Sequence, residues 1–194
     1  QGFFQEQYWP SHRGFDTFFG YLGPYIDYYD YTLQMFNRNY SRGYDMRRDL
    51  NVDRSYERVY ATDMFTKEAV DIIENNGKDK PLFLIISHLA PHAGNEDIPL
   101  QVKPEDYEKF PYIENEQRRK LAGMVYSLDE SVGEIVEALV RTGLMNDTVL
   151  VFFSDNGGPA AFLHATTASN YPLRGVRKLQ KDTTFMEVPN LLEF

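Results

Sequence analysis

Two uninterrupted apolar runs, each preceded by a helical pattern, limit the folds that this chain can adopt. Residues 82–86 read LFLII, and residues 148–153 read TVLVFF. Short runs of this kind, without polar alternation, are typical of strands that are buried on both faces, as in parallel sheets. Strands that alternate with helices predict an α/β fold.

Each run follows a segment with helical spacing. In residues 62–77 the apolar side chains fall on one face, and Thr62 or Asp63 is expected to cap the helix. In residues 116–142 apolar side chains recur every three or four positions, and Gly143 is expected to close the helix. Helix, strand, loop, long helix and strand therefore follow one another in α/β order.

Polar side chains follow both runs where parallel strands would end. His92 lies in the loop after the first run, and Asp155 and Asn156 directly follow the second, ahead of two glycines. Ligands of open parallel sheets bind outside the carboxyl ends of the strands. A carboxylate and a carboxamide suit Ca²⁺, although the same five residues, SDNGG, are also typical of a turn.

His92 and a basic cluster each have a functional interpretation and a plainer one. A loop histidine can donate a proton to a leaving group because its pKa lies near neutrality, or it can be an exposed side chain without a role. The basic cluster can clamp an oxyanion or form a solvated turn. Its members are Arg174, Arg177, Lys178 and Lys181.

Residues 20–32, GYLGPYIDYYDYT, are rich in tyrosine and show no helical or strand period. Two interpretations fit this segment: an aromatic platform that binds sugar, or a long surface segment packed by its own rings.

Composition excludes several classes of protein and site. The formal net charge of −9 disfavours nucleic-acid binding, which needs a basic face, and no apolar stretch approaches the ~20 residues of a membrane span. The absence of cysteine excludes disulfides, thiolate metal sites and a cysteine nucleophile within these 194 residues. N-glycosylation sequons at Asn39 and Asn146 favour the secretory pathway, with a lysosomal or extracellular destination.

Six segments, taken together and in order, resemble the sulfatase family, and within it the arylsulfatase B-like branch. They are RGFDTFFGYLGPYIDYYDYT, PLFLIISHLAPHAG, IPLQVKPEDY, LAGMVYSLDESVGEIVEAL, TVLVFFSDNGG and SNYPLRG. The resemblance runs from about Gly2 to Val176. It implies an alkaline-phosphatase-like α/β fold, with a mostly parallel sheet between helices. It also implies hydrolysis of the sulfate esters of glycosaminoglycans or of aryl sulfates.

The resemblance further implies one Ca²⁺ and a formylglycine nucleophile that is made from a cysteine. Asp155 and Asn156 match Ca²⁺ ligands of the family, and Asp155 also matches the residue that helps to activate the hydrated formylglycine. His92 matches the histidine that contacts the sulfate and protonates the leaving group. The family's sulfate-binding lysine falls at Arg177 or, with a shift of one position, at Lys178.

Three family motifs are missing from these residues: Cys-x-Pro-x-Arg, an early Asp-Asp pair that completes the Ca²⁺ shell, and Lys-Trp-His-Leu-Gly. We therefore expect a partial catalytic domain over residues 1–194, inactive alone and with apolar surface exposed. It would comprise a tyrosine-rich segment at 1–60, an α/β core at 61–160, and a basic loop with a divergent tail at 161–194. Two alternatives remain: a pseudoenzyme that binds sulfated glycans without turnover, and a phosphodiesterase of the same superfold.

Overall fold

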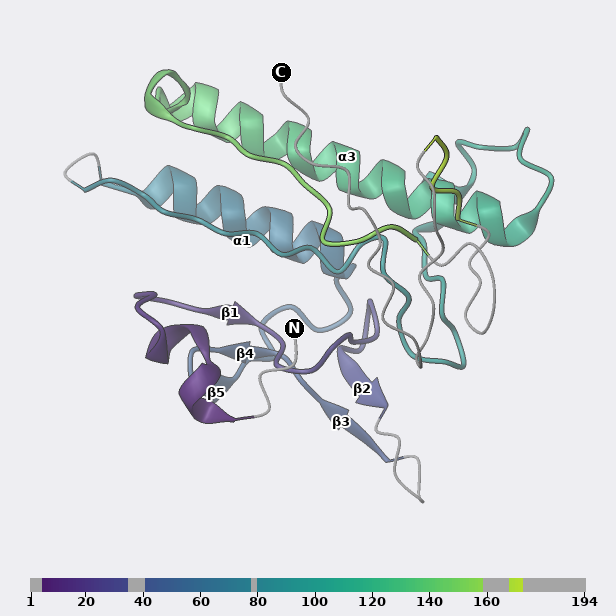
Figure 1. The fold of residues 1–194 in the computed structure, drawn as a ribbon, viewed down its shortest axis with the longest axis horizontal. Helices are drawn as coiled ribbons and strands as arrows, with labels where there is room; N and C mark the ends of the chain where they lie inside the picture. Colours follow the sequence, from purple (N-terminus) through teal and green to yellow (C-terminus); the bar gives the residue numbers. More distant parts are fainter. Residues whose placement is uncertain (1–4, 35–40, 78–79, 159–167, 173–194) are drawn as a thin grey trace.

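The computed structural model describes residues 5–34, 41–77, 80–158 and 168–172. Its helices are α1 (Ala61–Asn75), α2 (Pro104–Tyr107) and α3 (Glu116–Thr142), with single 3₁₀ turns η1 (Glu6–Tyr8), η2 (Pro10–His12) and η3 (Met145–Asp147). Its strands are β1 (Phe19–Gly20), β2 (Thr32–Gln34), β3 (Arg42–Tyr44), β4 (Arg47–Arg48) and β5 (Asn51–Val52). Figure 1 shows α1 and α3 side by side, above the short strands.

Helix α3 confirms its sequence prediction at both ends. Asn115 caps the first turn, because its side-chain oxygen accepts the backbone N–H of Arg118 at 2.9 Å. Gly143 follows the last turn in the left-handed conformation, with φ of 75°, and its N–H donates to the carbonyl of Val140. Glycine adopts this conformation without the steric cost that a side chain would add.

Helix α1 begins one residue earlier than predicted and has no side-chain cap, so the expectation that Thr62 or Asp63 caps it is wrong. The N-cap residue is Tyr60, and the N–H of Ala61 donates to the carbonyl of Tyr28 at 2.8 Å. A carbonyl from a distant part of the chain thus satisfies one of the backbone donors that open a helix. Thr62 instead lies buried inside the first turn.

Helices α1 and α3 pack together along their apolar faces. Thr66 donates a hydrogen bond to Ser131 across the interface at 2.5 Å, and Arg141 pairs with Glu74 near the C-terminal ends. Small side chains in the contact allow the two helices to approach closely. The buried apolar residues of the interface are Ala69, Ile73, Ile135, Ala138 and Leu139.

The two apolar runs that were predicted as buried strands form no strand in the structure. Residues 82–86 and 149–153 run beside the helices and make no backbone hydrogen bond to another described residue. One face of the first run is covered, because Leu84 packs against the α1–α3 interface. The other face is open, and the side chains of Phe83 and Val149 are 75% and 90% exposed.

This difference from the prediction has a physical reason. A strand depends on ladder partners, and every ladder within the described ranges lies between residues 19 and 52, away from both runs. Covered and open side chains still alternate along residues 83–86, which is the period of two that a pleated strand requires. The first run therefore keeps a strand-like path and packs one apolar face on the helices while leaving the other accessible, whereas residues 149–153 are exposed throughout.

The tyrosine-rich segment belongs to the core, which corrects the expectation that it is a surface segment. Tyr21, Tyr28 and Tyr31 are buried. Tyr28 stacks on Tyr60 with ring centroids 5.1 Å apart, and the hydroxyl of Tyr31 donates to the carbonyl of Tyr56 at 2.7 Å. Buried phenol groups are stable here because their hydroxyls reach backbone acceptors.

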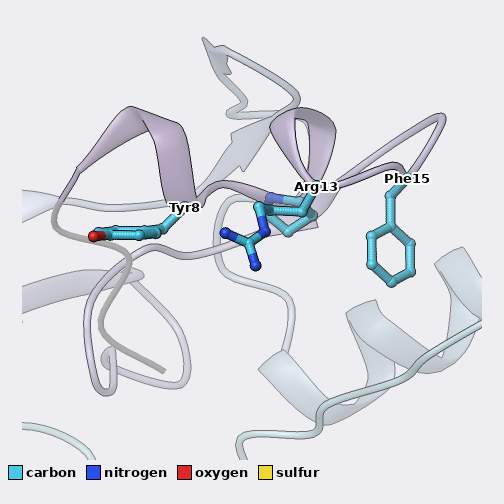
Figure 2. Close-up of a pocket in the computed structure, with 4 residues that line it drawn as sticks. Tyr8, Arg13 and Phe15 are labelled. Carbon is cyan, nitrogen blue, oxygen red and sulfur yellow. The ribbon is translucent and has the colours of Figure 1, made fainter.

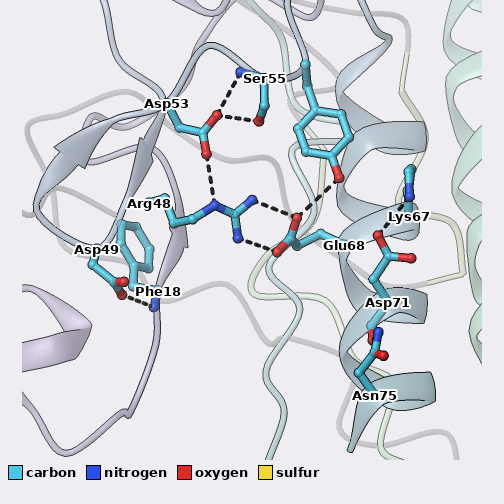
Figure 3. A network of polar contacts seen from close by, with 10 residues as sticks. Phe18, Arg48, Asp49, Asp53, Ser55, Lys67, Glu68, Asp71 and Asn75 are labelled. Carbon is cyan, nitrogen blue, oxygen red and sulfur yellow. Dashed lines mark hydrogen bonds and ion pairs between the residues drawn. The ribbon is translucent and has the colours of Figure 1, made fainter.

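The short strands form two antiparallel sheets, β1-β4-β5 and β2-β3. Figure 3 shows how the first sheet is tied to α1. Arg48 on β4 bonds both carboxylate oxygens of Glu68 on α1, at 2.5 and 2.9 Å, and bonds Asp53 at 2.9 Å. Its guanidinium also lies over the ring of Phe19 at 4.5 Å. Bidentate pairing of this kind fixes geometry as well as adding stability.

We expect Phe83→Lys to reduce self-association of the 194-residue chain, because it places a charge on the open apolar face. Leu84→Lys is the matched control on the covered face. It should lower the free energy of unfolding by about 2 kcal/mol, because it pushes a charge against the helix interface. Light scattering measures association, and urea unfolding followed by circular dichroism measures stability. If the two substitutions had equal effects on association and on stability, Phe83 and Leu84 would not lie on an open and a covered face.

Candidate functional site

The backbone of His92 is held from two directions. Its N–H donates to the carbonyl of Leu89 at 2.8 Å, which closes a turn that contains the cis Ala90–Pro91 bond. Its carbonyl accepts the hydroxyl of Tyr28 at 2.8 Å. The loop after the first apolar run is therefore anchored to the core at the predicted site residue.

The side chain of His92 is exposed, yet its ring has a defined orientation. The ring stacks on Tyr25, with centroids 6.0 Å apart and an interplanar angle of 18°. Its Nδ1 lies 2.6 Å from the carbonyl oxygen of Ala93. Because a carbonyl can only accept, Nδ1 carries the hydrogen of the neutral ring. Nε2 is then the nitrogen that remains to exchange a proton.

Asp155 and Asn156 follow the second run. Asp155 is exposed and makes no hydrogen bond to a described residue. Asn156 is half-buried, its Nδ2 donates to the carbonyl of Gly157 at 3.0 Å, and its Oδ1 accepts no hydrogen bond from a described residue. Both side chains thus present oxygen atoms that can bind a ligand.

The side chain of Asn170 fixes the glycines that follow. Its Oδ1 accepts the N–H of Gly158 at 2.9 Å, and its Nδ2 donates to the carbonyl of the same residue at 2.9 Å. A Cβ atom on Gly157 would lie 2.7 Å from this Oδ1, so a side chain would not fit there. One amide therefore joins the SDNGG and SNYPLRG segments.

Two ring contacts link the end of the first run to Tyr21. The ring of His88 meets Phe65 edge-on at 6.4 Å, and Phe65 contacts the ring of Tyr21 at 6.2 Å. The pKa of Tyr21 is raised by burial and, to a smaller extent, by the negative charges of Asp45 and Asp155.

The oxygens of Asp155 and Asn156 suit a hard cation in their chemistry but not in number. Ca²⁺ takes about 6–8 oxygen ligands. Within residues 5–34, 41–77, 80–158 and 168–172, no group of three or more His, Cys, Asp or Glu side chains could hold a metal ion. Asp155 and Asn156 alone therefore offer fewer oxygens than a Ca²⁺ shell needs, and within the described part of the chain no hydrogen bond or ion pair links them to His92.

The remaining predicted site residues are the sulfate-binding candidates and the two glycosylation sites. Arg177, Lys178 and Asn39 lie outside the described residues. Asn146 is exposed on η3. Sequence reasoning did not single out Tyr25 or Asn170. Asn170 stands within the SNYPLRG segment, so the family resemblance offered a signal for it, whereas nothing in the tyrosine-rich segment marked which ring meets His92.

A pocket of about 380 Å³ lies away from these residues, near the start of the described chain. It is lined by Tyr8, Pro10, Arg13 and Phe15, and Figure 2 shows the guanidinium of Arg13 between the two aromatic rings. None of the predicted site residues lines this pocket.

Sequence comparisons place the chain among known proteins. A family model described as Sulfatase matches residues 1–189. Arylsulfatase J of Mus musculus is 36% identical over 176 residues, which are 90% of this chain and 27% of the relative. N-acetylgalactosamine-6-sulfatase of Homo sapiens is 26% identical over 183 residues, which are 92% of this chain and 32% of the relative. The chain thus spans about a third or less of the length of these curated relatives.

A solved structure agrees with the sequence comparisons. The crystal structure of Ps i-CgsB in complex with k-i-k-neocarrahexaose matches with a TM-score of 0.71 and 33% sequence identity. The match covers 88% of this chain and 38% of that chain. No helix among the described residues is long and apolar enough to cross a membrane.

His88, at the end of the first run, has a largely buried ring. Its Nε2 lies 3.1 Å from Oγ of Ser131, and its Nδ1 is buried without a partner in the described ranges. Burial lowers the pKa of His88 to about 4, compared with about 6.5 in an unfolded chain. Between these values the unfolded chain binds a proton that the folded chain does not. The stability contributed by neutral His88 is therefore complete above pH 6.5 and is lost as the pH falls toward 4.

We expect His88→Gln to weaken the pH dependence of stability, because glutamine can still bond Ser131 but does not titrate. Between pH 7 and pH 4 the free energy of unfolding of the unsubstituted chain should fall by roughly 3 kcal/mol more than that of the variant. Urea unfolding at several pH values measures this difference. His12→Gln, at an exposed histidine, is the control and should behave like the unsubstituted chain. A variant that follows the same pH profile would show that His88 titrates normally.

Proposed function

The chain belongs to the sulfatase family and has its alkaline-phosphatase-like α/β fold, and from this premise we propose that the protein hydrolyses sulfate esters. The observation that carries the proposal is the match of one family model to residues 1–189, which include His92, Asp155 and Asn156. Because a fold alone does not determine a function, each of these side chains needs a role that its surroundings allow.

The role of His92 in this proposal is to protonate the leaving alcohol. Nδ1 is committed to the carbonyl of Ala93, so Nε2 is the atom that can hold the proton. As the bond between sulfur and the leaving oxygen breaks, the proton passes from Nε2 to that oxygen. The exposed position of the side chain is compatible with direct contact to a substrate.

Asp155 and Asn156 would hold Ca²⁺ through their free oxygens, and Arg177 or Lys178 would bind the sulfate. A bound Ca²⁺ would offset the negative charge of the sulfate, and a formylglycine would supply the nucleophile. The cysteine from which formylglycine is made is absent from these 194 residues. These residues would thus bind and orient the sulfate ester and transfer a proton to its leaving oxygen.

The substrate class in this proposal is a sulfated sugar or an aryl sulfate. Two relatives carry the names arylsulfatase J and N-acetylgalactosamine-6-sulfatase, and a structural relative was solved with k-i-k-neocarrahexaose. The sequons at Asn39 and Asn146 support glycosylation and a secretory, lysosomal or extracellular location, and Asn146 is exposed as modification requires. Residues 61–160 would form the α/β core of the catalytic domain.

We expect His92→Gln to lower kcat by about 10²-fold or more, as loss of a general acid typically does. The substitution is made in the protein expressed from the full reading frame that contains these residues, together with an enzyme that generates formylglycine. Hydrolysis of 4-nitrocatechol sulfate is followed by absorbance. His12→Gln is the matched control, because His12 is exposed and pairs only loosely with Glu6 at 3.7 Å.

Full activity in His92→Gln would overturn the acid role of this residue. Absence of hydrolysis in the unsubstituted protein, combined with binding of sulfated glycan, would favour the pseudoenzyme instead. The 194-residue chain, which contains no cysteine, serves as the blank and should not exceed the rate in buffer.

A further inference from the structure

We infer that Tyr25 and Tyr28 are positioning residues, which hold His92 in its Nδ1–H tautomer and keep Nε2 open. The role of His92 in proton donation rests on the proposed function, whereas its orientation is argued from contacts within the chain. Both tyrosines come from residues 20–32, more than sixty positions before the loop, and each contacts His92 at a different point. One holds the ring and the other holds the backbone.

Tyr28 fixes the backbone of His92 from inside the core. Its side chain is fully buried, and its hydroxyl donates to the carbonyl of His92 at 2.8 Å. Its own backbone N–H donates to the side-chain oxygen of Gln101 at 2.6 Å, and its ring stacks on Tyr60. A buried tyrosine whose hydroxyl and backbone N–H are both paired has little freedom to move. The hydroxyl of Tyr28 is therefore a fixed donor to the carbonyl of His92.

The loop beyond His92 is anchored to the same segment. Asn95 is buried, accepts the N–H of Gln34 at 2.9 Å and donates to the carbonyl of Thr32 at 3.0 Å. The N–H of Gly94 bonds the carbonyl of Pro99 at 2.9 Å, which closes the loop on itself. The loop therefore cannot swing away without breaking buried hydrogen bonds.

Tyr25 acts on the imidazole ring. The two rings are nearly parallel, at 18°, and Tyr25 is half-buried. The observed stacking favours the imidazole orientation parallel to the phenol ring, in which Nδ1 faces the carbonyl of Ala93. A flip about the Cβ–Cγ bond would reverse the imidazole. In the flipped state a carbon atom would face the carbonyl of Ala93, and the hydrogen bond from Nδ1 would be lost.

This arrangement prepares His92 for proton donation at one atom. When the ring is protonated, Nδ1–H remains bonded to Ala93, and Nε2–H can transfer its proton to a leaving oxygen. The ring then returns to the neutral Nδ1–H form without exchanging tautomers.

The test is the tautomer of His92 in the 194-residue chain, measured by long-range ¹H–¹⁵N correlation with labelled histidine. At about pH 8 an unperturbed imidazole is neutral. The His92→Gln spectrum assigns the signal. We expect the unsubstituted chain and Tyr25→Phe to show a protonated Nδ1 and an unprotonated Nε2, and Tyr25→Leu to shift toward the Nε2–H form that free histidine prefers. Tyr28→Phe should shift it in the same direction by a smaller amount.

Tyr29→Leu is the matched control, because Tyr29 is a half-buried tyrosine of the same segment whose ring contacts Tyr60 instead. Circular dichroism confirms that each variant keeps its helices. An Nε2–H tautomer in the unsubstituted chain would overturn the inference, and so would an unchanged tautomer in Tyr25→Leu. A shift of the same size in Tyr29→Leu would also overturn it, by showing a general loosening of the segment.

Turnover separates this inference from the proposed function. In the protein expressed from the full reading frame, Tyr25→Leu should lower kcat by about 10-fold with KM little changed, and Tyr25→Phe should restore it. If His92→Gln is fully active, the acid role fails while the tautomer result still stands on its own. If His92→Gln is inactive and Tyr25→Leu keeps both its tautomer and its kcat, the positioning role alone fails.

Discussion

One buried tyrosine links the parts of this structure. Tyr28 is fully buried, and each of its polar groups is paired: its carbonyl with Ala61 at the start of α1, its N–H with Gln101, and its hydroxyl with His92. A buried polar group that loses its partner costs about 1–3 kcal/mol. These hydrogen bonds therefore fix the tyrosine-rich segment relative to the first turn of α1 and to the loop that contains His92. The position of His92 follows from core packing and not from the loop alone.

The two extended runs show a second constraint. Their open faces carry Phe83 and Val149, whereas parallel strands of α/β folds are normally covered on both faces. The chain spans 27% and 32% of two sulfatase relatives and 38% of a structural relative. Each of these relatives is therefore more than twice as long as the segment that matches, and the described residues leave apolar faces open along both runs.

The sequence predicted the bounds of a helix where the signals lie within or next to that helix. Helical spacing and Gly143 placed α3 at the correct end residues, because both signals lie within or next to the helix. The start of α1 could not be predicted, because a carbonyl from Tyr28 satisfies its first donor. Burial of the tyrosine-rich segment and the absence of ladders along the apolar runs likewise depend on distant contacts. In the candidate site, the sequence placed His92 and Asp155 beyond the two runs, but the ring that orients His92 had no sequence signal.

We propose that His92, Asp155 and Asn156 form one part of a sulfatase site whose nucleophile lies outside these 194 residues. Sequencing the complete transcript that encodes this segment tests it most directly. We expect codons for Cys-x-Pro-x-Arg and for Lys-Trp-His-Leu-Gly in the same frame, upstream of the codon for Gln1. A transcript whose reading frame starts next to Gln1 and stops after Phe194 would contradict the catalytic role and leave glycan binding as the function to measure.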